Sequence, residues 1–203
     1  MGGFFGVASK EDCMFDVFFG TDYHSHLGTR RAGIAVYSKE EGFNRAIHNI
    51  ENSPFRTKFD KDVNEMSGNL GIGCISDFEP QPLLVRSHHG TYAISTIGII
   101  NNADSLIDQY LTFSGGHFDA MTGGKVNTNE LIAALISLKS SFVEGIQFVQ
   151  DIVVGTANIL ILTDNGELIA ARDKMGRIPV QIGKNEDGYC ASFERFAYTK
   201  LGF

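Results

Sequence analysis

The sequence predicts an α+β fold with one sizeable hydrophobic core or two small ones. The chain has 203 residues, of which 43% are apolar, and this share is large enough to bury a sizeable core. Segments with strand character at both ends of the chain flank central segments with helical spacing, so strands and helices do not alternate as in a parallel α/β protein. No repeat, low-complexity tract or linker divides the sequence, and we expect residues 1–203 to form a single domain.

The N-terminal half predicts apolar strands and one helix. Ser9 precedes the acidic residue Glu11, and we expect it to cap a helix that runs towards Gly20. The segment Lys39–Glu65 is polar and charged, which is typical of structure at the surface. The predicted strands are Gly2–Ala8, Arg31–Tyr37, Gly68–Ser76 and Thr91–Ile97.

The second half predicts two helices followed by short strands. Asn101 or Asn102 is positioned to cap the first helix. The second helix begins at about Asn127 or Thr128 and runs to Leu138, with its apolar residues on one face. An Asp-Asn-Gly sequence favours a hairpin turn between the first two of the strands, so we expect an antiparallel meander. The predicted strands are Ala157–Thr163, Leu168–Arg172, Val180–Gly183 and Gly188–Ser192.

The composition argues against several classes of function. The chain has 24 Asp and Glu against 17 Lys and Arg, and this net charge of −7 opposes binding to nucleic acids. Its apolar runs are far shorter than the ~20 residues needed to cross a bilayer, and no signal-peptide pattern opens the chain. The 3 cysteines are widely spaced without a Cys-x-x-Cys pair, as expected of reduced thiols. We therefore expect a cytoplasmic protein with no nucleic-acid partner, membrane contact, metal site or cofactor.

The residue types that could carry chemistry form no catalytic constellation by spacing alone. His24 and His26 are two residues apart and would point to different faces of a helix, so we expect capping or surface roles for them rather than metal binding. Cys13 lies in a helix rich in phenylalanine, and Cys74 in a strand flanked by glycines. For both cysteines we expect a buried, structural role.

Five segments, in the same order along the chain, resemble motifs of the class II glutamine amidotransferases, and most closely the N-terminal glutaminase domain of amidophosphoribosyltransferases. The family's mature chain opens with Cys-Gly, and the segment Gly2–Val7 keeps the glycines and the apolar pattern but not the cysteine. The other four segments are Leu27–Ala35, Gln81–Leu83, Leu168–Val180 and Ala191–Glu194. The resemblance spans nearly the whole chain and implies the four-layer α-β-β-α sandwich of the N-terminal-nucleophile hydrolases. It also implies a phosphoribosyltransferase domain in a longer parent protein.

The resemblance places the family's site residues at five positions of this chain. The N-terminal cysteine, which attacks the side-chain amide of glutamine, falls at Gly2. The arginine that binds the substrate carboxylate falls at Ser76, and the aspartate that binds its amine falls at Thr128. The Asn-Gly pair that forms the oxyanion hole falls at Ile97 and Gly98, where only the glycine is kept.

These replacements imply a domain that keeps the family's fold without its catalytic residues. Loss of a nucleophile costs on the order of 10⁶ in turnover, and loss of one oxyanion donor roughly 10² to 10³. The leading hypothesis is therefore a catalytically degenerate domain with a structural, regulatory or ligand-sensing role. Its expected partners are a small molecule in the vestigial glutamine pocket, a phosphoribosyltransferase-type domain or subunit, and further copies of itself in a homo-oligomer.

Two alternatives stay open at this point. The first is an active amidotransferase domain that supplies ammonia for purine-type biosynthesis through a displaced nucleophile, Cys74 or Cys13. The second is a non-enzymatic domain that organises a larger assembly.

Overall fold

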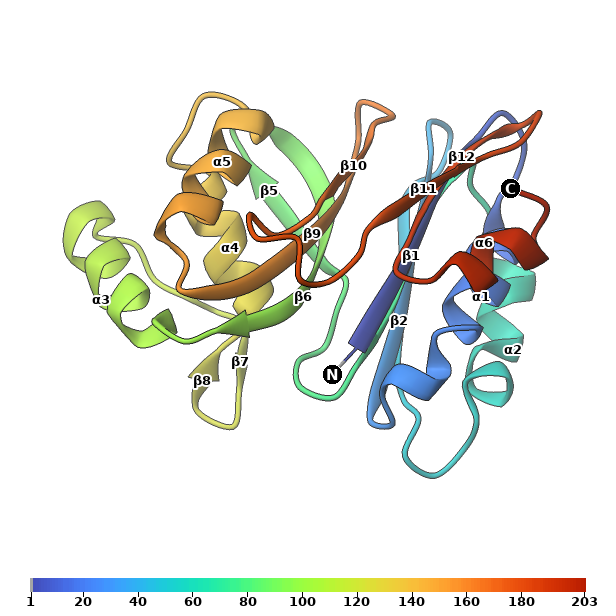
Figure 1. Ribbon diagram of the computed structural model, residues 1–203, viewed down its shortest axis with the longest axis horizontal. Helices are drawn as coiled ribbons and strands as arrows, with labels where there is room; N and C mark the ends of the chain where they lie inside the picture. Colours follow the sequence, from blue (N-terminus) through green and yellow to red (C-terminus); the bar gives the residue numbers. More distant parts are fainter. Residues whose placement is uncertain (1) are drawn as a thin grey trace.

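The computed structural model describes residues 2–203, which form two β-sheets packed face to face between two layers of helices (Figure 1). The strand pairs within both sheets are antiparallel. This architecture confirms the α+β class and the four-layer α-β-β-α order. Within residues 2–203, no helix combines the length and the hydropathy that crossing a bilayer requires.

The first sheet carries the N-terminal strand in its interior. Its strands are β1 (Gly2–Ser9), β2 (Arg31–Ser38), β3 (Gly42–Asn49), β4 (Leu70–Ser76), β11 (Gln181–Lys184) and β12 (Gly188–Ser192), in the order β11-β12-β1-β4-β2-β3. The helices on its outer face are α1 (Met14–Asp22), α2 (Phe55–Glu65) and α6 (Arg195–Lys200), and a short 3₁₀ helix, η1 (Ser25–Leu27), follows α1. Phe5 of β1 and Phe18 of α1 are buried together in the core between this sheet and its helices.

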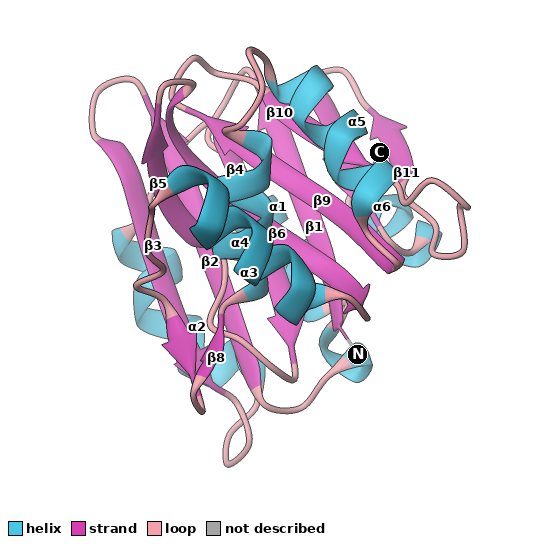
Figure 2. Cartoon of the chain, turned by 90° about the vertical axis from the view of Figure 1, so that its left-hand side faces the viewer, coloured by secondary structure: helices cyan, strands magenta, loops and turns pink. Residues whose placement is uncertain are grey.

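The second sheet has the order β10-β9-β6-β5 and is covered by the central helices, which lie in front of it in Figure 2. Its strands are β5 (Leu83–Ser87), β6 (Gly90–Ile100), β9 (Gly155–Thr163) and β10 (Leu168–Ala171). The helices are α3 (Ala103–Ser114), α4 (Thr128–Ile136) and α5 (Phe142–Ile152), and a small hairpin of β7 (Met121–Thr122) and β8 (Lys125–Val126) precedes α4. Ile94 of β6 and Ile132 of α4 are fully buried between the sheet and its helices.

The core between the two sheets fixes which face of β1 looks towards the second sheet. Phe4 is fully buried there with Leu160 of β9, and its ring lies 4.4 Å from that of Phe193. Because side chains alternate along a strand, Phe5 points to the helices and Gly2 shares the inter-sheet face with Phe4. The position of Gly2, at the beginning of β1, therefore faces the second sheet.

The segment Lys39–Glu65 lies at the surface, as expected, and contains the edge strand β3 and the helix α2. Phe55, Phe59 and Val63, spaced four residues apart, bury one face of that helix. Charged residues outnumber this apolar stripe in the segment, so the composition alone does not reveal the buried face.

The four C-terminal strands do not form one meander. β9 and β10 form the expected hairpin, with Gly166 at a φ of 86° in its turn, but β11 and β12 pair in the other sheet. The chain crosses between the sheets after β10, where the buried Asp173 accepts hydrogen bonds from the backbone amides of Met175 and Arg177. Turn sequences predict which neighbouring strands pair, but they do not predict which sheet the pair joins.

The helix caps agree in part with the expectations. Asn127 caps α4 by accepting a hydrogen bond from the amide of Asn129. Ser9 does not cap α1, since its hydroxyl accepts from Glu11 outside the helix. Asn102 precedes α3 without capping it through its side chain, which binds backbone groups at the end of α5 instead.

Candidate functional site

The structure brings Gly2, Ser76 and Ile97 together at one end of the two sheets. Gly2 and Ser76 are direct partners in the β1–β4 pairing, and both are buried. A Cβ atom built on Gly2 would lie 2.3 Å from the carbonyl oxygen of Ile75 and 3.1 Å from Cδ1 of Ile97. A side chain at position 2 would thus meet a neighbouring strand and Ile97.

Gly98 lies in a close approach between β6 and β9. A Cβ atom at this position would be 2.0 Å from the carbonyl oxygen of Thr156, so the tight packing of the strands requires glycine here. The fully buried Asn158 donates from Nδ2 to the carbonyl of Ile97 at 3.3 Å. Its Oδ1 accepts from the amide of Asp173 at 3.1 Å, which ties the end of β6 to the crossing between the sheets. No sequence motif singles out Asn158, because its role depends on pairing across the sheet.

Thr128 is the first residue of α4. Its backbone amide donates to Oε1 of Glu79 at 2.9 Å, and its hydroxyl donates to the same oxygen. Asn127 donates from Nδ2 to the carbonyl of Pro80 at 3.2 Å. The resemblance places an aspartate at position 128, and here a carboxylate reaches that position from Glu79. Sequence reasoning did not find Glu79, which lies 49 residues away along the chain.

The segment of residues 77–82, which we call the strap, connects β4 to β5 and contacts the start of α4 through Glu79 and Pro80. It passes beside the N-terminal end of β1 in Figure 1. Oδ1 of Asp77 accepts a hydrogen bond from the amide of Thr29 at 2.7 Å. Burial raises the pKa of the Asp77 carboxyl, but hydrogen bonds from backbone amides, including that of Thr29, lower it, and the pKa lies below its usual value. Asp77 is thus held as a carboxylate beside Ser76.

The three cysteines are buried thiols. Sγ of Cys74 donates to the carbonyl of Gln81 at 3.2 Å, and burial raises the pKa of this thiol to about 12. Burial also raises the pKa of Cys190 to about 12 and that of Cys13 further above its ordinary value. Since the thiolate is the reactive form, none of the three is an activated nucleophile in this conformation. The structural role expected for Cys13 and Cys74 agrees with their burial.

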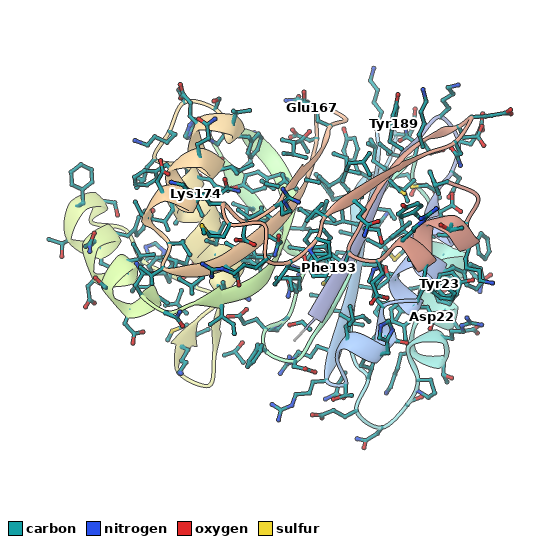
Figure 3. The ribbon with its side chains drawn as sticks, in the orientation of Figure 1. Asp22, Tyr23, Glu167, Lys174, Tyr189 and Phe193 are labelled. Atoms are coloured by element: carbon teal, nitrogen blue, oxygen red, sulfur yellow. The ribbon has the colours of Figure 1, made fainter. Side chains whose placement is uncertain are left out.

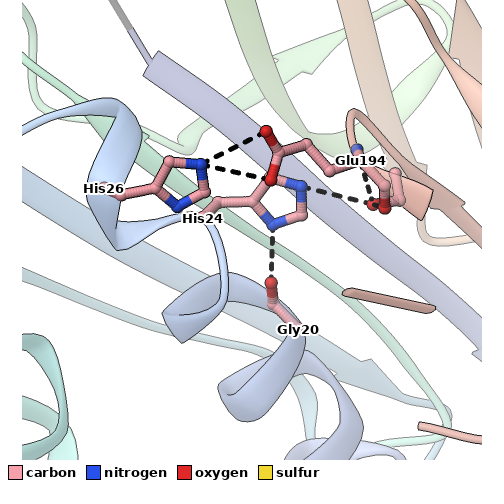
Figure 4. Close-up of polar contacts among 5 residues, drawn as sticks. Gly20, His24, His26 and Glu194 are labelled. Atoms are coloured by element: carbon pink, nitrogen blue, oxygen red, sulfur yellow. Dashed lines mark hydrogen bonds and ion pairs between the residues drawn. The ribbon is translucent and has the colours of Figure 1, made fainter. Parts of the chain in front are cut away.

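His24 lies beneath the beginning of β1 (Figure 4). It is fully buried, and a Cβ atom on Gly3 would be 3.1 Å from its Cδ2. Its Nδ1 lies 2.6 Å from the carbonyl oxygen of Gly20, which can only accept, so Nδ1 carries a proton and Nε2 faces the hydroxyl of Ser192 at 3.2 Å. Burial lowers the pKa of His24. Of the expected capping or surface roles, His24 has a capping role, because its Nδ1 donates to a carbonyl in the last turn of α1. His26 has the surface role and contacts Glu194 in solvent.

Two hollows lie elsewhere on the molecule. Lys174 lines the first and Tyr189 lines the second, and both residues are labelled in Figure 3. The first has a volume of about 280 Å³, between the end of α5 and the crossing segment, with an ion pair of Lys174 and Asp151 at 2.5 Å. The second, of about 700 Å³, is an open depression beside β12. Neither hollow is lined by Gly2, Ser76 or Thr128. Among residues 2–203, no group of three or more metal-binding side chains is gathered in one place.

No family model matches the chain. Curated relatives and solved structures are similar to it. The amidophosphoribosyltransferase of Methanocaldococcus jannaschii is 30% identical over 213 residues, which cover 99% of this chain and 44% of the relative. That of Bacillus subtilis is 26% identical over 211 residues, covering 98% of this chain and 42% of the relative. This chain therefore spans less than half the length of these relatives.

The solved structures agree with the relatives. The glutamine phosphoribosylpyrophosphate (PRPP) amidotransferase from B. subtilis, complexed with ADP and GMP, has a TM-score of 0.85 at 25% identity over 98% of this chain and 43% of its own. A structure described as the allosteric regulatory enzyme of purine biosynthesis has a TM-score of 0.83 at 25% identity, with the same coverage. The chain therefore has the fold of the N-terminal domain of amidophosphoribosyltransferases, which is of the N-terminal-nucleophile type.

Proposed function

We propose that this chain is an amidophosphoribosyltransferase-like glutamine amidotransferase domain that no longer hydrolyses glutamine and has a structural, regulatory or ligand-sensing role. The observation that carries the proposal is the packing at Gly2, the position that matches the family's nucleophile. A side chain there would meet the backbone of Ile75 at 2.3 Å and the side chain of Ile97 at 3.1 Å. Both the thiol and the space for it are missing.

The other substrate contacts would be weak as well. Ser76 offers one uncharged hydroxyl where a bidentate cation would bind the carboxylate of glutamine, and this hydroxyl already accepts from the amide of Phe78 at 3.2 Å. The side chain of Ile97 has no donor for an oxyanion. Hydrogen bonds to charged groups contribute roughly 1.5 to 3 kcal/mol each, so their loss weakens both binding and turnover.

The alternative of an active domain requires a nucleophile elsewhere. Cys74 is the cysteine nearest to the candidate site in the chain, two residues before Ser76, but it is fully buried and its proton is held by Gln81. Cys13 lies in the outer core with α1 and is also fully buried. Either thiol would need a rearrangement of the surrounding core before it could attack an amide.

The partners that we propose follow from the relatives. These enzymes are more than twice as long as this chain, so we propose that the chain acts with a phosphoribosyltransferase-type domain or subunit, in a homo-oligomer. We propose a small, weakly charged molecule as the ligand of the remnant site. Unpaired thiols in all three cysteines fit the cytoplasmic location that we expect.

Glutamine hydrolysis tests the proposal. We expect the purified chain to release no glutamate or ammonia from glutamine above the rate of a heat-inactivated sample. Gly2→Cys alone should stay inactive, because the position is packed and three further contacts are absent. Turnover in the range of ordinary amidotransferases, about 1 s⁻¹ or more, would contradict the proposed loss of activity. A shift in melting temperature with glutamine but no hydrolysis would support ligand sensing.

A further inference from the structure

The hollow of about 280 Å³ at the end of α5, which we call the α5 hollow, is bordered by three parts of the chain. Its walls come from the last turn of α5, the start of β9 and residues 173–177 of the crossing between the sheets. Ligand pockets begin at roughly 300 Å³. The α5 hollow therefore suits a molecule with few non-hydrogen atoms.

Hydrogen bonds fix the frame of the α5 hollow. The carboxylate of Asp173, which is 5% exposed, accepts from the amides of Met175 and Arg177 at 2.9 Å each. Nε2 of Gln150 donates to the carbonyl of Arg172 at 2.5 Å and so ties α5 to the crossing. A ligand would meet a preformed wall here, which lowers the entropy cost of binding.

The α5 hollow carries both signs of charge. Nζ of Lys174 lies 2.5 Å from Oδ1 of Asp151, and the two side chains are 62% and 64% exposed. Exposed ion pairs contribute little to stability, so this pair can open when a ligand offers a partner to each member. Nη1 of Arg177 donates to the carbonyl of Gly155, and because a guanidinium has five N–H donors, one bond does not exhaust it. With Asp173, the lining holds two acidic and two basic side chains and no net charge.

The end of α5 strengthens the negative side of the hollow. The last carbonyls of a helix lack partners within the helix, and this end of the helix dipole attracts cations. The last turn of α5 contains no basic residue, and the cation paired with Asp151 there, Lys174, comes from the crossing. An ammonium group of a ligand would be attracted to the same place.

Apolar side chains border the same hollow. Val153, Val154, Ala157 and Met175 all line it. Val154 is 59% exposed and Met175 is 69% exposed. Contact with an apolar part of a ligand would remove this surface from water, which is favourable.

We propose that the α5 hollow binds a small zwitterion, a free α-amino acid with an apolar side chain. Its carboxylate accepts from Lys174 and Arg177, and its ammonium group donates to Asp151 at the end of α5. Its side chain packs on Val154 and Met175. A ligand with a single charge is disfavoured, because it would take one member of the ion pair and leave the other without a partner.

The α5 hollow is separate from the remnant glutamine site. Gly2, Ser76 and Thr128, which match the family's glutamine contacts, do not line it. The inference therefore goes beyond the proposed function and does not depend on whether the chain hydrolyses glutamine.

Titration of the full chain with L-leucine, followed by ¹H–¹⁵N NMR, tests the site. We expect saturable shifts of the amides of residues 150–155 and 173–177, with a Kd of about 1 mM or below. Two further probes keep the carbon skeleton of leucine but lack one charge each: 4-methylpentanoate lacks the ammonium group, and 3-methylbutylamine lacks the carboxylate. Both should bind roughly tenfold more weakly or worse, because each leaves a charged side chain unmatched.

The double variant Asp151→Asn/Lys174→Met removes the ion pair without changing the net charge. It should weaken the binding of L-leucine roughly tenfold, as expected when hydrogen bonds between charged groups are lost. Lys61→Met/Glu65→Gln is the matched control, since it removes an exposed ion pair of 3.6 Å on α2. The control should leave the Kd for L-leucine unchanged.

Four results would overturn the proposal. The first is the absence of saturable shifts with L-leucine, and the second is equal affinity for all three probes, which would leave no role for the paired charges. The third is an equal loss of affinity in the control variant. The fourth is a set of shifts at Ser76 and Thr128 instead of the α5 hollow. That pattern would assign the binding to the remnant glutamine site and would leave the proposed function standing.

Discussion

Single residues decide what the candidate site can do, and Gly2 is the most informative of them. We propose that it stands where the family has its nucleophile, and a Cβ atom there would lie 2.3 Å from the carbonyl oxygen of Ile75. Overpacked positions in well-packed cores cost about 1–3 kcal/mol of folding free energy. The absence of a side chain at Gly2 is therefore also a packing requirement.

Gly2→Ala should lower the free energy of unfolding by about 1–3 kcal/mol, because the added methyl group would meet the backbone of Ile75. Urea unfolding followed by circular dichroism measures this change. Gly116→Ala is a suitable control, since its added methyl group would meet only side-chain atoms of Ser114 and Tyr110, at 3.1 Å or more. Equal stability of Gly2→Ala and the wild-type chain would show that the position has room for a side chain.

His24 predicts a pH dependence of stability. Burial lowers its pKa in the folded chain below the ordinary 6.5, so the unfolded chain binds the proton first as the pH falls. Its contribution to stability is therefore complete above about pH 6.5 and decreases below it, by at most about 1.4 kcal/mol per pH unit. His24→Gln should flatten the stability profile between pH 7 and pH 5 relative to the wild-type chain. Equal slopes for the variant and the wild-type chain would contradict this role of His24.

At the level of elements, the sequence predicts where strands form better than it predicts which strands pair with one another. The strands β1, β2, β4 and β9 follow from runs of apolar residues, and the hairpin turn at Gly166 follows from its local sequence. The sheet that receives β11 and β12 depends on the crossing at Asp173, which no local pattern specifies. For the same reason Glu79 was missed, since its partner Thr128 is distant in the sequence.

The helix α2 gives an element-scale prediction. Phe59 is fully buried in a segment whose composition suggests surface structure, and Phe59→Ala should cost about 3–5 kcal/mol of stability. Thr57→Ala, on the exposed face of the same helix, should change stability by less than about 0.5 kcal/mol. Thermal unfolding of both variants measures the difference. Similar losses for the two would mean that α2 contributes little to the core.

At the scale of the whole molecule, evidence for the fold is not evidence for the chemistry of the site. Five matching segments imply the sandwich, and the TM-score of 0.85 to the B. subtilis enzyme confirms it. Fold alone does not carry an activity, because an activity depends on the residues of a site. Here β1 begins beside Ser76 of β4, and Gly98 packs closely against Thr156 of β9. We propose that the charged and nucleophilic side chains of the family are missing from the matching positions. The proposed loss of activity therefore requires that no other residue acts as the nucleophile.

A search for a covalent intermediate tests this claim most directly. The chain would be incubated with glutamine, quenched in acid, and its intact mass and cysteine-containing peptides measured by mass spectrometry. We predict an unchanged mass and unmodified Cys13, Cys74 and Cys190, with no glutamate formed. A γ-glutamyl thioester on any of these cysteines, formed with release of ammonia, would contradict the account and identify the chain as a working amidase.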